Sequence, residues 1–145
     1  MIYKFLFPMK PDSNGASLFL LVLRIFFGLL LMSHGVQKWS HFQELSISFP
    51  DPLGVGSTMS LALAIFAELG CSMAFIVGFL YRLAMIPMIF TMCVAFFVIH
   101  ANDPFSTKEL ALIYLVVFVV MYIAGPGKFS VDYWLGKQLH SRSNV

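Results

Sequence analysis

Charged residues are scarce in this chain of 145 residues. Asp, Glu, Lys and Arg make up 11% of it, whereas 59% is hydrophobic and 16% is aromatic. Soluble domains are nearer one quarter charged, so this composition excludes an ordinary water-soluble domain. The formal net charge of +2 is small and the basic residues are scattered, which argues against nucleic acid as a partner.

Cysteine is equally scarce. Cys71 and Cys93 both lie deep in apolar tracts, where cysteine usually behaves as a small hydrophobe. The chain has no Cys-x-x-Cys, no Cys-x-x-Cys-His and no paired Glu-x-x-His, so we expect neither a redox cysteine pair nor a bound metal or haem. His34 and His100 on facing helices are the remaining way to clamp a cofactor, but neither lies at mid-membrane.

Long apolar runs, by contrast, fill most of the sequence. A bilayer span needs about 20 predominantly apolar residues, and the segments 18–39, 58–79, 83–100 and 109–125 approach or meet that length. Backbone groups in lipid must find partners within the segment, so these segments are predicted to be helices. We therefore expect an all-α, integral membrane four-helix bundle, a single domain over residues 1–145, with a short interfacial C-terminal helix near residues 133–140.

The basic residues predict how this bundle is oriented. Four spans place both termini on the same side of the membrane, and most Lys and Arg residues fall there, whereas Lys38 and Lys108 fall on the other side. Short cytoplasmic loops are enriched in Lys and Arg. We therefore expect both termini in the cytoplasm. The longest connection, residues 40–57, then lies on the opposite side and is compatible with a half-buried lid.

Two opposite charges interrupt the first two apolar tracts. By the helix rise of about 1.5 Å per residue, Arg24 lies roughly 10 Å inside one surface and Glu68 roughly 15 Å inside the other. A charge in hydrocarbon costs roughly 3 kcal/mol, so it usually faces a partner or a wet cavity. We predict an ion pair between Arg24 and Glu68, which either supports a functional site or only fixes the register of the bundle.

Further polar residues gather at the non-cytoplasmic ends of the tracts. His34, Gln37 and Lys38 end the first tract, His100 ends the third, and residues 108–109 begin the fourth. Such a mouth suits the polar head of an amphipathic ligand, with the aromatic-rich interior taking its tail. A histidine and a carboxylate beside a quinone ring can exchange protons with it. The alternative is the ordinary polarity of helix ends at a membrane surface.

An ordered set of short segments resembles the DoxX family of small bacterial four-helix membrane proteins. The set covers roughly residues 17–135 and consists of Leu23-Arg24-Ile25 with Gly28, His34-Gly35-Val36-Gln37-Lys38, Ala67-Glu68-Leu69, Gly78-Phe79-Leu80-Tyr81-Arg82, His100 with Lys108-Glu109-Leu110-Ala111-Leu112, and Gly125-Pro126-Gly127-Lys128-Phe129-Ser130-Val131-Asp132. The resemblance implies a location in the bacterial inner (plasma) membrane. It also implies association with oxidoreductase assemblies, some of them linked to quinones, although fold transfers within a family far better than function.

These observations lead to one main hypothesis for the function. We expect a membrane subunit of a redox-linked system that binds a quinone or a similar amphipathic molecule, with His34, Glu68 and His100 as catalytic candidates. Arg24, Gln37 and Lys38 are the candidate ligand-binding residues. The expected partners are membrane lipid, a redox partner protein and a second copy of the chain.

The alternative hypothesis is a non-enzymatic scaffold. Such a protein would dock partners or oligomerise through the small residues Gly28 and Gly35, because glycines on a helix face let another helix approach closely. A small transporter is less favoured, since no repeat of broken helices is visible.

Overall fold

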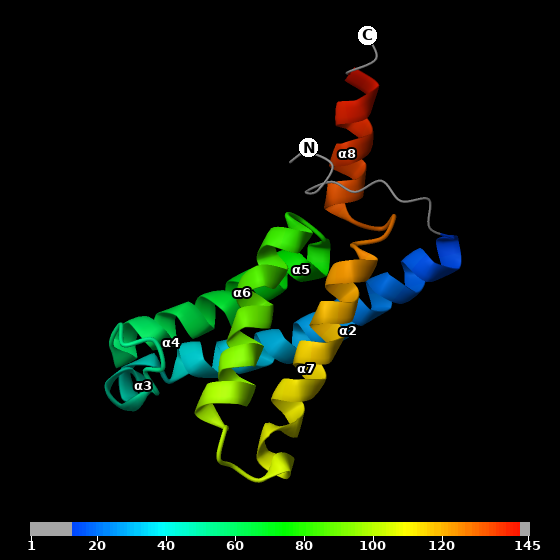
Figure 1. Ribbon diagram of the computed structural model, residues 1–145. Coiled ribbons are helices and arrows are strands. Elements are labelled where there is room, and N and C mark those ends of the chain that lie inside the picture. The colour runs from blue at the N-terminus through cyan, green and yellow to red at the C-terminus, as the bar shows by residue number, and fades with distance from the viewer. Residues whose placement is uncertain (1–12, 143–145) are drawn as a thin grey trace.

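The computed structural model describes residues 13–142, with side chains described up to Leu139. This part of the chain contains helices and no strand, which confirms the all-α prediction. Figure 1 shows the elements in order, where η denotes a π-helical segment: α2 (Asn14–Ser40), α3 (Phe42–Ser48), α4 (Ser57–Ile65), η1 (Phe66–Cys71), α5 (Ser72–Val77), α6 (Tyr81–Val94), η2 (Ala95–Ile99), α7 (Phe105–Ala124) and α8 (Val131–Arg142).

Within the described residues, four helical stretches are long and apolar enough to cross a membrane. They are Asn14–Ser40, Ser57–Val77, Tyr81–Ile99 and Phe105–Ala124, so the four predicted apolar helices are present, with shifted ends. The first begins earlier than expected because the Ser13 hydroxyl accepts a hydrogen bond from the Ala16 N–H and caps the helix. The fourth also begins earlier, directly after Pro104, which has no N–H to continue a helix backwards.

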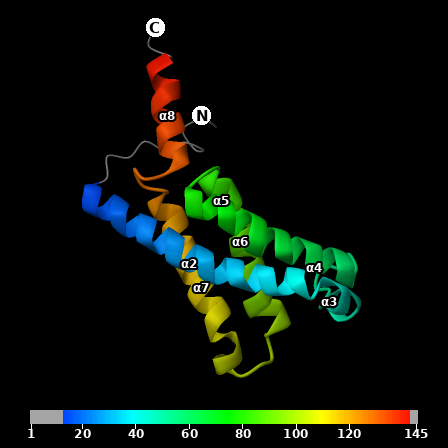
Figure 2. The same cartoon turned by 180° about the vertical axis from the view of Figure 1, so that it is seen from behind.

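The spans form two antiparallel pairs that cross each other. One pair is α2 with the continuous helix α4–η1–α5, and the other is α6–η2 with α7. Figures 1 and 2 show that the pairs meet near α8 and splay apart at the end that holds α3 and the α6–α7 turn. The expected loop over residues 40–57 thus contains a helix, α3, and the bundle has a closed end and an open end.

Aromatic and sulfur-containing side chains fill the core where the two pairs cross. Phe75 of α5 stacks on Tyr81 of α6 with ring centroids 5.5 Å apart, and it meets Phe118 of α7 edge to face at 5.5 Å. Tyr114 and several methionines of α6 complete the cluster. Aromatic pairs in these geometries stabilise a core beyond their buried area, so this cluster holds the crossing point.

Arg24 lies at the closed end and is only 1% exposed. Its guanidinium donates hydrogen bonds to the backbone carbonyls of Ile76 (2.8 Å from Nη2), Pro126 (2.6 Å from Nη1) and Phe129 (3.0 Å from Nη2). The carbonyl of Ile76 is one of the last of α5, which has no partner within its own helix. Arg24 therefore joins α2 to the end of α5 and to the segment that follows α7.

The predicted ion pair between Arg24 and Glu68 is therefore wrong. Glu68 pairs instead with Lys38, which lies almost four helical turns beyond Arg24, about 20 Å along the helix axis. The depth argument failed because it measured each residue from a different end, whereas α2 and α4–η1–α5 pack side by side with Gly35, not Arg24, opposite Glu68. It also ignored backbone carbonyls as partners for a guanidinium.

Asp132, which is fully buried, fixes the turn between α5 and α6. Its carboxylate accepts hydrogen bonds from the N–H groups of Leu80 and Tyr81, both 2.8 Å away, and so caps α6. Leu80 has a φ of 44°, a left-handed conformation that costs a bulky residue free energy. Burial raises the pKa of the Asp132 carboxyl, although these two N–H groups oppose the shift. Burying this carboxylate costs free energy, and its two hydrogen bonds to the strained turn offset that cost.

The start of the first span touches the segment after the fourth. The Ser17 hydroxyl, which is buried, accepts a hydrogen bond from the N–H of Lys128 at 3.2 Å. The ammonium of Lys128 donates to the side-chain oxygen of Asn14 at 3.1 Å. These contacts place both ends of the four-span unit together, as an even number of spans requires. The segment 1–12 lies outside the described residues.

We predict that Asp132→Ala lowers the free energy of unfolding by about 2–4 kcal/mol, because two N–H groups of a strained turn lose their acceptor. Asp132→Asn keeps one acceptor oxygen, so its stability should lie between that of the parent protein and that of Asp132→Ala. The measurement is the thermal unfolding midpoint of the purified protein in detergent. Glu109→Ala, which removes an exposed carboxylate, is the control and should leave the midpoint unchanged. Equal midpoints for Asp132→Ala and the control would contradict the role of Asp132.

Candidate functional site

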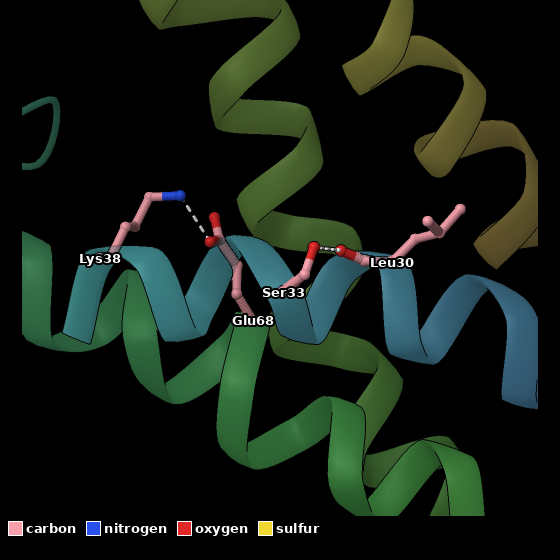
Figure 3. A network of polar contacts seen from close by, with 4 residues as sticks. All are labelled: Leu30, Ser33, Lys38 and Glu68. Carbon is pink, nitrogen blue, oxygen red and sulfur yellow. Dashed lines mark hydrogen bonds and ion pairs between the residues drawn. The ribbon is translucent and has the colours of Figure 1, made fainter. Parts of the chain in front are cut away.

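An ion pair joins the first two spans toward the open end of the bundle. The Lys38 ammonium of α2 lies 2.5 Å from the Glu68 carboxylate of η1, and Figure 3 shows the two side chains pointing toward each other. The Lys38 side chain is 25% exposed and the Glu68 side chain is 7% exposed. Charges within a span are costly unless they are paired, so each of these two residues requires the other as its partner.

A glycine brings the two helices close enough for this pair to form. Gly35 lies one turn before Lys38, and a Cβ at its position would stand 2.7 Å from the backbone N of Leu69 and 2.9 Å from the carbonyl carbon of Glu68. Only glycine permits such an approach. Gly28 likewise faces the side chains of Ile76 and Phe75 of α5. Both glycines therefore pack against helices of the same chain, and oligomerisation stays a prediction.

A cavity of about 520 Å³ opens beside the ion pair, between α4–η1 and α6–η2. Sites for small ligands typically measure about 300–1,000 Å³ and combine apolar walls with a few polar groups. The walls here are mostly apolar and come from both helices and from the loop before α4. The lining residues are Lys38, Phe49, Pro50, Pro52, Leu53, Ser60, Leu63, Ala64, Phe66, Ala67, Glu68, Pro87, Phe90, Thr91, Val94, Ala95, Ile99 and His100.

Both π-helical segments of the described residues border this cavity. η1 contributes Phe66, Ala67 and Glu68, and η2 contributes Ala95 and Ile99. A π-turn inserts an extra residue into a helix and is frequent at functional sites, because it redirects side chains and weakens the regular packing. Here η1 lies where Glu68 meets Lys38, and α6 contacts η1 directly. The irregular helices therefore coincide with the hollow part of the bundle.

Five polar side chains line the otherwise apolar cavity. They are Lys38, Ser60, Glu68, Thr91 and His100. His100 follows η2 at the end of the third span, and its Nδ1 lies 2.6 Å from the Asp103 carboxylate. A carboxylate at one ring nitrogen fixes the orientation of a histidine ring. The cavity thus offers an ammonium, a carboxylate and an imidazole to a bound molecule.

The loop before α4 supplies one wall of the cavity, and Asp51 holds this loop in shape. Its carboxylate accepts hydrogen bonds from the Ser60 hydroxyl at 2.7 Å and from the N–H groups of Val55 and Gly56 at 3.0 and 2.8 Å. The Ser60 hydroxyl, followed by the Gly56 N–H, lowers the pKa of Asp51 below its ordinary value of 3.8. This stabilisation is present at pH values above 3.8 and is lost as the pH falls through the depressed pKa. The Asp51 carboxylate is therefore ionised at neutral pH, and its hydrogen bonds hold the loop that forms this wall.

The structure brings together three of the six predicted site residues. Lys38, Glu68 and His100 line the cavity. Arg24 does not line it and bonds to carbonyls at the closed end. Gln37 is exposed, so its side chain turns away from the interior.

His34 is half-buried and meets the ring of Tyr114 edge to face, with centroids 6.3 Å apart. It therefore faces α7 rather than the cavity. Lys108, at the start of α7, donates to the carbonyl of Ala101 in the α6–α7 turn. The expected convergence of polar helix ends is therefore partial. The catalytic and ligand-binding roles assigned to all six residues stay predictions.

The sequence reasoning missed several parts of the cavity. Ser60, Ala64 and Glu68 recur at intervals of four residues, which places them on one helix face, and this spacing was available as a signal. Likewise Pro87, Thr91 and Ala95 share a face of the third span. The π-helical segments carry no sequence signal that we recognise. The capping of α6 by the distant Asp132 was also missed.

Fold and site together define a class of protein: a small multi-pass helical membrane protein with a ligand-sized cavity and a partly buried ion pair. The sequence pattern of the DoxX family matches residues 19–101, which is more than half of the chain. The chain belongs to the DoxX family. It is also 28% identical over 142 residues to a protein of Haemophilus influenzae described only as uncharacterized, covering 92% of this chain and 94% of the relative. No solved structure matches the chain.

We predict that Gly35→Ala disturbs the ion pair, because its methyl group would push against the backbone of η1. Overpacking of this kind costs about 1–3 kcal/mol, so the thermal unfolding midpoint should fall. Gly70→Ala is the matched control within η1, since a Cβ there meets only ordinary contacts, 3.5 Å from Phe66. The control midpoint should stay unchanged or rise. A fall in both variants would mean that η1 tolerates no added methyl group, and the special role of Gly35 would be wrong.

Proposed function

We propose that this protein binds a quinone, or a similar amphipathic molecule, in the cavity between its second and third spans, as the membrane subunit of a redox-linked system. The observation that supports this most is the Lys38–Glu68 pair, separated by 2.5 Å, in the wall of an apolar cavity of about 520 Å³. Apolar walls with a few converging polar groups are typical of small-molecule sites. The proposal requires no metal and no haem.

The chemistry of the three polar residues suits a quinone head. A lysine ammonium has three N–H donors, of which the bond to Glu68 uses one, so Lys38 can also donate to a quinone carbonyl oxygen. A carboxylate accepts from the hydroxyl of a quinol. His100, oriented by Asp103, can exchange a proton with the ligand at the cavity's edge. We assign Lys38 to binding and Glu68 and His100 to proton transfer.

The redox step needs a partner. Reduction of a quinone to a quinol takes up two electrons and two protons, and its oxidation releases them. Glu68 and His100 handle the protons in this proposal, and a redox partner protein supplies or removes the electrons. We place the chain in the bacterial inner membrane with both termini in the cytoplasm, as the distribution of Lys and Arg indicates. The cavity then lies toward the periplasmic side.

The scaffold hypothesis has less support than before. It relied on Gly28 and Gly35 as docking faces, and both face helices of the same chain. A scaffold also has no need for a deep ion pair beside a cavity, since apolar residues of similar volume are often as stable as a buried pair.

The proposal predicts that ligand binding depends on the ion pair. Changing both partners, Lys38→Met with Glu68→Met, leaves no unpaired charge and should preserve the fold. It removes hydrogen bonds to charged groups and should weaken binding of a short-tailed ubiquinone analogue by about tenfold or more. The chain has two tryptophans, so Trp134→Phe leaves Trp39, the neighbour of Lys38, as the single fluorescent reporter. Quenching of Trp39 by the quinone gives the dissociation constant.

The matched control is Lys108→Met with Glu109→Met, which removes the same two charges at the start of α7 outside the cavity. It should bind the analogue like the parent protein. If the Lys38/Glu68 double variant folds and binds equally well, the ion pair does not hold the ligand and the proposal is wrong. If the parent protein shows no saturable quenching, and native mass spectrometry finds no co-purified amphiphile, the scaffold hypothesis is favoured.

A further inference from the structure

The outer wall of the cavity is made of side chains that are exposed at membrane depth. Leu63 (45% exposed) and Phe66 (57%) belong to the second span, and Phe90 (52%) belongs to the third. Phe66 and Phe90 lie near the midpoints of the spans Ser57–Val77 and Tyr81–Ile99. Exposed apolar side chains at that depth face the acyl chains of lipids, not water. This wall therefore borders hydrocarbon.

The two helices that form this wall each present one face to the cavity. Along α6–η2 the lining positions Pro87, Phe90, Thr91, Val94 and Ala95 follow the i, i+3, i+4 spacing of a helix face. Along α4–η1 the small residues Ala64 and Ala67 lead to Glu68. The cavity therefore extends from the exposed phenylalanines to the buried carboxylate, and its polarity increases inward from lipid.

We propose that the ligand is a single-tailed lipid of the bilayer, which enters sideways between the second and third spans. Its polar head reaches Lys38 and Glu68, and its tail passes Phe66 and Phe90 into the surrounding hydrocarbon. This inference rests on the proposed function for the head, and it adds the route of entry, the position of the tail and the ligand class. A water-soluble molecule entering from the aqueous face is excluded by the proposal.

Photo-crosslinking tests the position of the tail. A decyl-tailed ubiquinone analogue with a diazirine at the end of its tail is incorporated with the protein into phosphatidylcholine nanodiscs, and a second probe has its diazirine on the ring. Specific labelling is the part that an excess of non-photoreactive analogue prevents. It should fall on the segments around Phe66 and Phe90 for the tail probe, and near Lys38 and Glu68 for the ring probe. In the double variant Lys38→Met/Glu68→Met the specific labelling by both probes should fall about tenfold.

The outcomes separate this inference from the proposed function. Competed tail labelling on α3 or on the loop before α4 would show entry from the water side, which overturns lateral entry and leaves quinone binding intact. An absence of competed labelling with both probes would overturn both proposals. A palmitate probe forms the third arm. If palmitate labels the Phe66 and Phe90 segments competitively and the quinone does not, lateral entry stands and the quinone assignment is wrong.

A second measurement tests whether the opening faces lipid. Phe90→Trp, with Trp39 and Trp134 changed to Phe, places a single tryptophan in the opening. Brominated phosphatidylcholine should quench it about as strongly as Val116→Trp in the same background, since Val116 is exposed on α7 away from the cavity. The water-soluble quencher acrylamide should have little effect. Strong quenching by acrylamide with weak quenching by the brominated lipid would overturn the inference, because the opening would then be aqueous.

Discussion

A charged side chain within a bilayer has no water to bind, so the protein itself has to supply its partners. This chain meets that constraint in two ways at the two ends of its bundle. At the closed end Arg24 donates to a carbonyl at the end of α5 and to two carbonyls of the segment between α7 and α8. At the open end Lys38 and Glu68 neutralise each other across two spans. Arg24 thereby ties α2 to the end of α5 and to the segment after α7, and the Lys38–Glu68 pair joins α2 to η1 beside the cavity.

The two arrangements differ in how many hydrogen-bond donors they leave free for a ligand. The guanidinium of Arg24 is surrounded by carbonyls of two segments, the end of α5 and the segment after α7, and is almost wholly buried, so it holds them together. Lys38 spends one of its three donors on Glu68, and both side chains border an open cavity. A saturated buried charge fixes structure, whereas an unsaturated one beside a cavity can bind a ligand. Two basic residues of the same helix thus have different roles.

The sequence was sufficient to predict the helices and to single out the polar side chains that lie within or beside them. The spans followed from length and hydropathy, and Lys38, Glu68 and His100 were chosen by their polarity within or beside apolar tracts. The sequence did not predict how the charges pair, because that depends on which turns of two neighbouring helices lie side by side and on free backbone carbonyls, and neither appears in a residue pattern. The sequence did not predict the cavity either, since no residue pattern marked the π-helical segments, such as Phe66–Cys71, that border it.

The charge balance of the site also bears on the nature of its ligand. When the cavity holds no ligand, Lys38 and Glu68 cancel each other, so neither charge is left uncompensated in a low-dielectric region. A neutral head that adds hydrogen bonds to both residues preserves that balance. An anionic head would compete with Glu68 for Lys38 and leave one carboxylate unpaired, at a cost of several kcal/mol for a buried ion. The ion pair therefore favours a neutral head such as that of a quinone over the carboxylate of a fatty acid.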